Sequence, residues 1–184
     1  MSVRAAFEAT VQRLVGLQVL SVDYRDLDPL DGELEHWDHG DWHNAVMGIE
    51  LHTSEGTRTV TWGSTFECYG IEIIEGELGE DLCRNGPEGD SFWSRAAGQR
   101  IEAATIGWQR WKVGASSWGP IRRWSDVDVP IALRLDFAAG PVWLLVAVPE
   151  ESGGASVGGD EMMVVLSGAL MRDLASFDDR SFAR

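Results

Sequence analysis

Lysine and cysteine are scarce in this chain of 184 residues, and it has few positive charges overall. Lys112 is the only lysine, and 15 Lys and Arg residues face 30 Asp and Glu residues, which leaves a formal net charge of −15. Binding to nucleic acids depends on neutralising phosphates and needs the opposite sign of charge. Docking on anionic membranes also needs positive charge on the protein. The sequence therefore predicts neither a nucleic-acid partner nor a membrane partner.

The cysteines and the short apolar runs exclude further classes of protein. Cys68 and Cys83 are too few for a disulfide framework, and they lack the Cys-x-x-Cys spacing of zinc ribbons and thioredoxin-like motifs. The longest apolar run, 142–148, has the length of a strand, whereas a membrane-spanning helix needs about 20 apolar residues. Glu8 and Arg13 interrupt any apolar core of a signal peptide. We therefore expect a cytoplasmic protein.

The spacing of apolar residues predicts a mainly β chain with a helix near each end. Helical spacing follows Ser2, a suitable N-cap, over 3–15, and a short helix is expected after Ser167. Alternation of side-chain types or short apolar runs predict strands over 19–24, 49–53, 57–62, 71–75 and 162–166. Glycine, proline and acidic residues predict long loops over 25–44, 76–91 and 114–130.

Two motifs recur in the same order along the chain. The pattern Arg-x-x-Gly-x-x-aliphatic occurs at 13–19 and again at 95–101, an offset of 82 residues. The pattern aliphatic-charged-Leu-x-x-x-x-Gly occurs at 49–56 and 133–140, an offset of 84 residues. Chance is the alternative, because the chain has 21 glycines and strand–turn–strand patterns are common.

A duplication explains the agreement in order and spacing better than chance does. We therefore predict an α+β fold, mainly antiparallel β, in a single domain over 1–184. Two pseudo-repeated β-halves, 13–75 and 95–166, share one core and are joined by a loop over 76–94. An N-terminal helix and a short C-terminal helix complete the fold.

Three of the four histidines lie within eight residues, in the segment His36-Trp37-Asp38-His39-Gly40-Asp41-Trp42-His43. Imidazole and carboxylate groups are metal ligands, so His36, His39 and His43 are the candidates for a metal site. The zincin pattern His-Glu-x-x-His is absent, since Gly40 follows His39. The alternative, which we favour, is a turn held by hydrogen bonds from Asp38 and Asp41 to the backbone. We therefore predict no metal.

The nine tryptophans are the second signal. Trp62 and Trp143 fall in predicted strands and are assigned to the core, whereas four others fall in predicted loops. An exposed indole beside carboxylates is typical of a recognition surface, where the ring supplies contact area and the carboxylates select a cationic partner. The alternative is that these rings close the ends of a small β-core. The predicted binding residues are Trp37, Asp38, His39, Asp41, Trp42, His43, Trp118 and Trp124.

Two stretches carry a resemblance to known proteins. They are Val60-Thr61-Trp62-Gly63-Ser64-Thr65-Phe66-Glu67-Cys68-Tyr69-Gly70-Ile71-Glu72 and Gly158-Gly159-Asp160-Glu161-Met162-Met163-Val164-Val165. Both stretches resemble parts of small, uncharacterised bacterial β-rich proteins. In size, acidity and expected location, the chain is also similar to the immunity proteins of bacterial polymorphic-toxin systems. Neither resemblance implies an active site, so no functional residue is transferred from it.

These observations favour a non-catalytic cytoplasmic protein whose acidic, Trp-bearing loops bind a basic protein partner, as an immunity protein or inhibitor does. The Walker loop and the dinucleotide-binding glycine motif are absent, and we predict no cofactor. The alternative is an enzyme or small-ligand-binding protein, metal-dependent in one version, whose loop 36–43 lines a pocket between the halves. A third interpretation is a structural subunit that forms a homodimer through an exposed edge strand such as 71–75.

Overall fold

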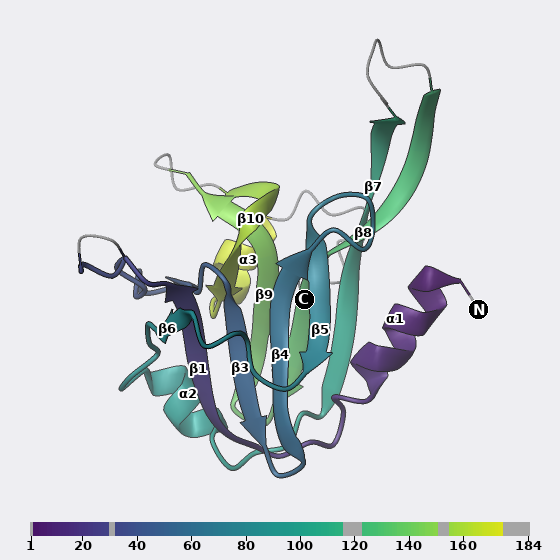
Figure 1. The fold of residues 1–184 in the computed structure, drawn as a ribbon. Helices are drawn as coiled ribbons and strands as arrows, with labels where there is room; N and C mark the ends of the chain where they lie inside the picture. Colours follow the sequence, from purple (N-terminus) through teal and green to yellow (C-terminus); the bar gives the residue numbers. More distant parts are fainter. Residues whose placement is uncertain (1, 30–31, 116–122, 151–154, 175–184) are drawn as a thin grey trace.

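The computed structural model describes residues 2–29, 32–115, 123–150 and 155–174, which form two five-stranded antiparallel sheets and three short helices (Figure 1). The sheets have the strand orders β5-β4-β3-β1-β6 and β2-β10-β9-β8-β7. No helix in these ranges has the length and apolar character needed to cross a membrane. The prediction of a mainly antiparallel α+β fold with a helix near each end is confirmed.

The first sheet follows from the alternation of side chains along its strands. Its strands are β1 (Val19–Leu27), β3 (Gly48–Thr53), β4 (Gly56–Gly63), β5 (Gly70–Glu75) and β6 (Leu82–Arg84). Ile49 and Leu51 of β3 point into the core and are fully buried. Glu50 lies between them and faces the other side of the sheet, beside Asp23 of β1 and Thr59 of β4. The outer face of this sheet is therefore polar.

The second sheet carries a two-stranded arm. Its strands are β2 (Trp42–Asn44), β7 (Ala103–Ala115), β8 (Arg123–Phe137), β9 (Gly140–Pro149) and β10 (Ala155–Val165). The ends of β7 and β8 project beyond the other strands (Figure 1). The β7–β8 ladder is irregular at Gly107 and Trp108, opposite Pro130, because proline has no N–H to donate to a ladder. The pairing of β10 with β9 is interrupted between Val157 and Met162.

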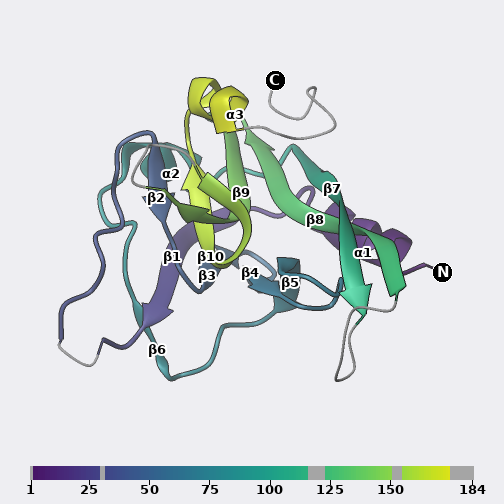
Figure 2. The same cartoon turned by 90° about the horizontal axis from the view of Figure 1, so that it is seen from above.

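The helices begin where side chains cap their first turns. Ser2 accepts a hydrogen bond from the N–H of Ala5 at the start of α1 (Val3–Gln12), which lies beside the edge strand β7 (Figure 2). Asp90 caps α2 (Ser91–Ala96). The third helix, α3 (Gly168–Leu174), covers the outer face of the second sheet.

The two halves of the chain meet through equivalent segments. The N–H of Gly16 donates to the carbonyl of Ile101 at 2.8 Å, and the N–H of Gly98 donates to the carbonyl of Val19 at 2.7 Å. The two hydrogen bonds are equivalent in the two halves. The donors Gly16 and Gly98 are 82 residues apart, and so are the acceptors Val19 and Ile101. Each half then continues as a four-stranded meander, β1-β3-β4-β5 or β7-β8-β9-β10. The two glycine-containing segments thus exchange equivalent hydrogen bonds, and each leads into a meander of four strands.

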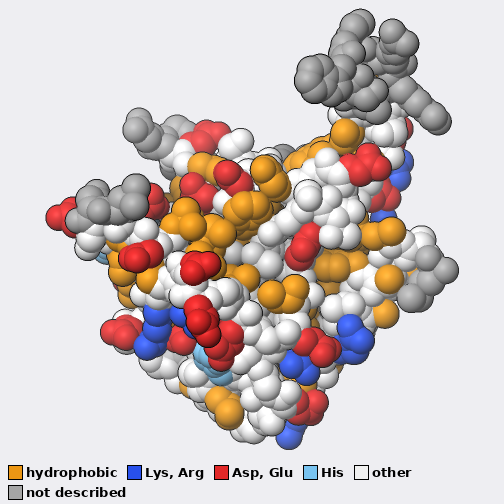
Figure 3. Space-filling model, in the orientation of Figure 1, with side chains coloured by type: hydrophobic (Ala, Val, Ile, Leu, Met, Phe, Trp, Pro, Cys, Tyr) orange, Lys and Arg blue, Asp and Glu red, His pale blue; other side chains and the backbone are white. Residues whose placement is uncertain are grey.

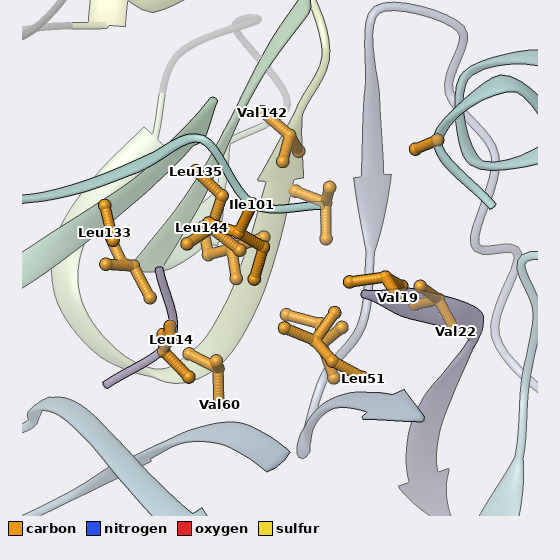
Figure 4. Packing of buried hydrophobic residues seen from close by; sticks show 14 of the residues in the cluster. Leu14, Val19, Val22, Leu51, Val60, Ile101, Leu133, Leu135, Val142 and Leu144 are labelled. Atoms are coloured by element: carbon orange, nitrogen blue, oxygen red, sulfur yellow. The ribbon is translucent and has the colours of Figure 1, made fainter. Parts of the chain in front are cut away.

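One apolar core lies between the sheets and draws on both halves (Figure 4). Leu51 and Val60 of the first sheet lie opposite Leu133, Leu135 and Leu144 of the second, and all five side chains are fully buried. Removing these branched side chains from water is the main favourable contribution to the fold. Because each sheet covers the core face of the other, the halves share a single core.

The segments predicted as uninterrupted loops contain further strands and a helix. β1 continues to Leu27, and the short strands β2 and β6 pair with the edges of the two sheets. The segment 76–94 contains β6 and the beginning of α2, and β8 begins at Arg123, so Trp124 lies on a strand. The prediction of continuous loops is wrong at these places. Strands of three residues are too short for alternation to show in the sequence.

Candidate functional site

The segment 36–43 forms a tight turn that leads into β2. The carboxylate of Asp38 accepts a hydrogen bond from the N–H of Gly40 at 2.9 Å, and the N–H of His39 donates to the carbonyl of Trp42 at 3.0 Å. The rings of His39 and Trp42 are stacked with their centroids 3.9 Å apart. Asp38, His39 and Asp41 are exposed, and Trp42 is half-buried. These three polar side chains and one face of the turn are available to a partner.

His43 lies inside the molecule, unlike the exposed part of this turn. Its side chain is 1% exposed, and its Nδ1 lies 2.8 Å from the hydroxyl of Tyr24. Trp93 donates its ring N–H to the same hydroxyl at 2.6 Å, so the hydroxyl proton is free to bond to His43. Trp37, half-buried, packs edge-on against His43 with a centroid distance of 4.9 Å. His43 and Trp37 therefore anchor the turn to the core.

Burial lowers the pKa of His43, although Asp90 and Asp38 near its Nε2 act in the opposite direction. The unfolded chain takes up a proton near the ordinary value of 6.5, whereas the folded protein resists it until a lower pH. We expect stability to decrease as the pH falls through 6.5. In His43→Gln this decrease should be smaller between pH 7 and pH 5, as measured by urea unfolding. A slope in His43→Gln equal to that of the wild type would contradict the argument.

The two tryptophans of the second predicted loop are not joined to this turn. Trp118 lies outside the described residues. Trp124 is 61% exposed, near the end of the β7–β8 arm. The arm and β2 lie on opposite sides of the molecule in the view from above (Figure 2). The structure therefore does not bring Trp124 together with the residues of the first loop.

The three candidate metal ligands do not converge. The Nδ1 of His43 faces Tyr24, and the Nε2 of His39 lies 3.0 Å from the backbone oxygen of His36. In the part of the chain that the structure describes, the three ligand atoms that do lie within 4.8 Å of one another belong to Asp23, Glu50 and His52.

This second group is already neutralised by arginines. Arg84 is 2.7 Å from Asp23, and Arg25 is 2.8 Å from Glu50. His52 lies 3.0 Å from Asp23. The two guanidinium groups supply the positive charge that a metal ion would bring, so these residues do not fit a metal site.

The spacing Gly-x-Ser-x-Gly occurs at 154–158, and it is typical of a nucleophile elbow. In an elbow the serine occupies a strained turn between a strand and a helix. Ser156 instead lies within β10, opposite Val148 of β9. The geometry of this serine is that of a strand residue, and it does not support an elbow.

A cavity of about 630 Å³, which we call the acidic cavity, is lined by residues from β1, β4, β10 and the segments that follow β1 and precede β3. Its carboxylates come from the end of β1, the following loop and β10: Asp26, Glu33, Glu35, Asp160 and Glu161. Its other lining residues are Leu27, Pro29, Leu34, Val46, Met47 and Trp62. No Lys, Arg or His belongs to this described lining.

Neutral amides contact two of the carboxylates of the acidic cavity. Asn44 donates to Glu35 at 3.2 Å, and Asn85 donates to Asp26 at 2.9 Å. Burial raises the pKa of Glu161, and the neighbouring charges of Glu35 and Asp160 raise it further. The cavity therefore concentrates negative charge that its own described lining does not balance.

Figure 3 shows that acidic and basic side chains occupy different parts of one face of the molecule. Acidic and apolar side chains are intermixed over its upper left part, while Lys and Arg side chains lie lower down and along the right-hand arm. The sequence did not single out Asp26, Glu35 and Trp62 as site residues. They come from separate segments that only the fold brings together, so no linear spacing marks them.

Comparisons of the chain with protein-family models, with curated proteins and with solved structures found no significant match.

Proposed function

We propose that this protein is a non-catalytic cytoplasmic binding protein that engages a basic protein partner, as an immunity protein or inhibitor does. The observation that carries the proposal is the acidic cavity, in which five carboxylates share one opening and the described lining contains no cation. Carboxylates held together in this way attract a positively charged group.

The composition of the cavity suits a long basic side chain of a protein. A Lys or Arg side chain has an apolar stem and a charged head, and it contacts apolar and acidic groups at once. The cavity offers both kinds of contact, because Leu27, Met47 and Trp62 line it beside the carboxylates. Its volume of about 630 Å³ also exceeds what a single metal ion needs.

The turn at 36–43 adds exposed carboxylates outside the acidic cavity. It follows Glu35 directly in the chain, and it exposes Asp38, Asp41 and the His39 ring stacked on Trp42. A surface with clustered negative charge accelerates association with a basic partner and makes the rate depend on salt. The predicted loop residues thus support the proposal as a further group of exposed acidic side chains, with His43 and Trp37 holding the turn in place.

Affinity capture at low salt from a lysate of the source organism tests the proposal. The cavity variant combines Glu35→Gln, Asp160→Asn and Glu161→Gln. The control variant, with the same change in net charge on exposed carboxylates, combines Glu55→Gln, Glu75→Gln and Glu102→Gln. We expect the wild type and the control to retain the same basic protein, and the cavity variant to lose it. Retention by all three proteins, or of no basic protein by the wild type, would contradict the proposal.

A further inference from the structure

A second pocket is lined by Tyr69, whose ring contacts Trp62 of the acidic cavity. Its volume is about 360 Å³, and we call it the aromatic pocket. It is lined by Ser64, Glu67, Cys68, Tyr69, Trp111 and Gly158. Burial and the charge of Glu67 raise the pKa of the Cys68 thiol, so this side chain stays protonated and acts as a small apolar wall.

The acidic cavity and the aromatic pocket share an aromatic wall. Trp62 lines the acidic cavity and Tyr69 lines the aromatic pocket. Their rings meet edge to face, with centroids 5.1 Å apart. The ring N–H of Trp62 is already donated to the carbonyl of Val46, at 3.1 Å. Trp62 therefore offers a partner its apolar ring rather than a hydrogen-bond donor.

The irregular part of β10 forms a second shared wall. Its pairing with β9 is interrupted between Val157 and Met162. Within this interruption Gly158 lines the aromatic pocket, whereas Asp160 and Glu161 line the acidic cavity. The two openings are therefore neighbours, separated by a ridge of two aromatic rings and by one short stretch of strand.

Gly158 allows the wall of the aromatic pocket to close. Its φ of +84° is unfavourable for residues with a side chain, and an added Cβ would lie 1.9 Å from the ring of Trp111. The indole of Trp111 therefore packs directly on the backbone of β10. This contact holds an apolar wall beside the acidic cavity, although the surrounding surface is rich in charge.

Resting on the proposed function, we propose that the acidic cavity and the aromatic pocket form one docking groove for a single segment of the basic partner. An arginine side chain of that segment enters the acidic cavity, and a nearby apolar side chain enters the aromatic pocket. Charge complementarity selects this occupant, since one end of the groove is acidic without a cation in its described lining and the other end is mainly apolar.

Arginine fits the acidic end for two reasons. Its planar guanidinium binds carboxylates through paired hydrogen bonds, and it is weakly hydrated enough to stack on an indole. Carboxylates and Trp62 line the same cavity. The exposed ring of Tyr69, 43% accessible, then provides apolar surface between the two side chains of the segment.

The test uses fluorescent synthetic peptides that contain one arginine and one leucine, separated by one to four glycines. In matched peptides the leucine is replaced by glycine, or the arginine by the uncharged citrulline. Ser64→Trp fills the aromatic pocket from its exposed rim, and Ser64→Ala is the control that leaves it open. Melting temperatures establish that both variants are folded, and fluorescence polarisation gives the affinities.

For the best spacing, we expect the leucine to increase affinity at least fivefold on the wild type and on Ser64→Ala. The increase should vanish on Ser64→Trp. A leucine without effect on the wild type, or an increase that persists on Ser64→Trp, would overturn the two-pocket groove. If the citrulline peptide fails to bind but the leucine has no effect, the result supports the proposed function and not the groove. A citrulline peptide that binds as well as the arginine peptide would overturn the proposed function itself.

Discussion

Arg25→Met is expected to lower the free energy of unfolding by about 3–5 kcal/mol, the usual cost of removing one partner from a buried ion pair. Both Nε and Nη2 of Arg25 lie 2.8 Å from the same carboxylate oxygen of Glu50, a residue with no exposed surface. The other oxygen of Glu50 accepts a hydrogen bond from the N–H of Leu78 at 2.8 Å. Without the guanidinium, the buried carboxylate of Glu50 would lose the cation beside it and the hydrogen bond that Arg25 donates.

The position of this ion pair explains why the loss should be large. The segment around Leu78 crosses the outer face of the first sheet, and the Cδ1 of Leu78 lies only 3.0 Å from where a Cβ on Gly48 would be. This crossing segment shields Glu50 from water and leads to β6. Loss of Arg25 should therefore also loosen the segment that connects the two halves.

Urea unfolding of the wild type and three variants measures the effect. The double variant Arg25→Met/Glu50→Gln should recover part of the loss, because it removes the unpaired charge as well. Arg95→Met, which changes an exposed arginine, should alter stability by no more than about 0.5 kcal/mol. A loss below about 1 kcal/mol in Arg25→Met would show that water reaches Glu50.

Glu161→Gln is expected to raise the melting temperature at pH 7 while weakening the binding of an arginine peptide. The pKa of Glu161 is raised in the folded protein, first by burial and then by Glu35, Asp160 and, more weakly, Asp26; a hydrogen bond with Asn44 opposes these effects. A carboxyl group with a raised pKa favours folding fully below its ordinary value of 4.5. That contribution is lost as the pH rises through the folded value, so the ionised group opposes folding at pH 7.

Thermal unfolding at two pH values tests the sign of this argument. The gain in melting temperature from Glu161→Gln should be present at pH 7 and smaller at pH 4. Affinity for the arginine peptide should fall about tenfold or more, since a partly buried charge pair is lost. Glu102→Gln, at an exposed carboxylate, should change neither quantity. A lower melting temperature at pH 7 in Glu161→Gln, or unchanged peptide binding, would contradict the assignment of this residue.

A higher melting temperature together with weaker peptide binding in Glu161→Gln would show that the acidic cavity lowers the stability of the free protein. Repulsion among Asp26, Glu35, Asp160 and Glu161 works against folding, and a cationic partner relieves it on binding. Such a trade-off between stability and function is common where a site must keep like charges together. It distinguishes the acidic cavity from the ion pair of Arg25 and Glu50, where the charges are already balanced.

Local patterns were enough to predict much of the fold. The alternation over 49–53 and 57–62 around a glycine-containing turn predicts the β3–β4 hairpin, and Ser2 marks the start of α1. The repeated Arg-x-x-Gly motif predicts two related halves, and Gly16 and Gly98 make equivalent hydrogen bonds, to Ile101 and to Val19. The composition also predicts the sign of a partner's charge. These features depend on neighbours in the chain, where periodicity, capping and turn chemistry act.

The tertiary structure alone decided which polar and aromatic residues form a site. His43 belongs to the same short segment as Asp38 and Asp41, yet it is buried because Tyr24 and Trp37 pack against it. The acidic cavity and the aromatic pocket combine residues from distant segments. Trp62, which the sequence assigned to the core, packs against the core and also lines the acidic cavity. Burial and the convergence of side chains depend on how the sheets pack, and no spacing along the chain encodes that packing directly.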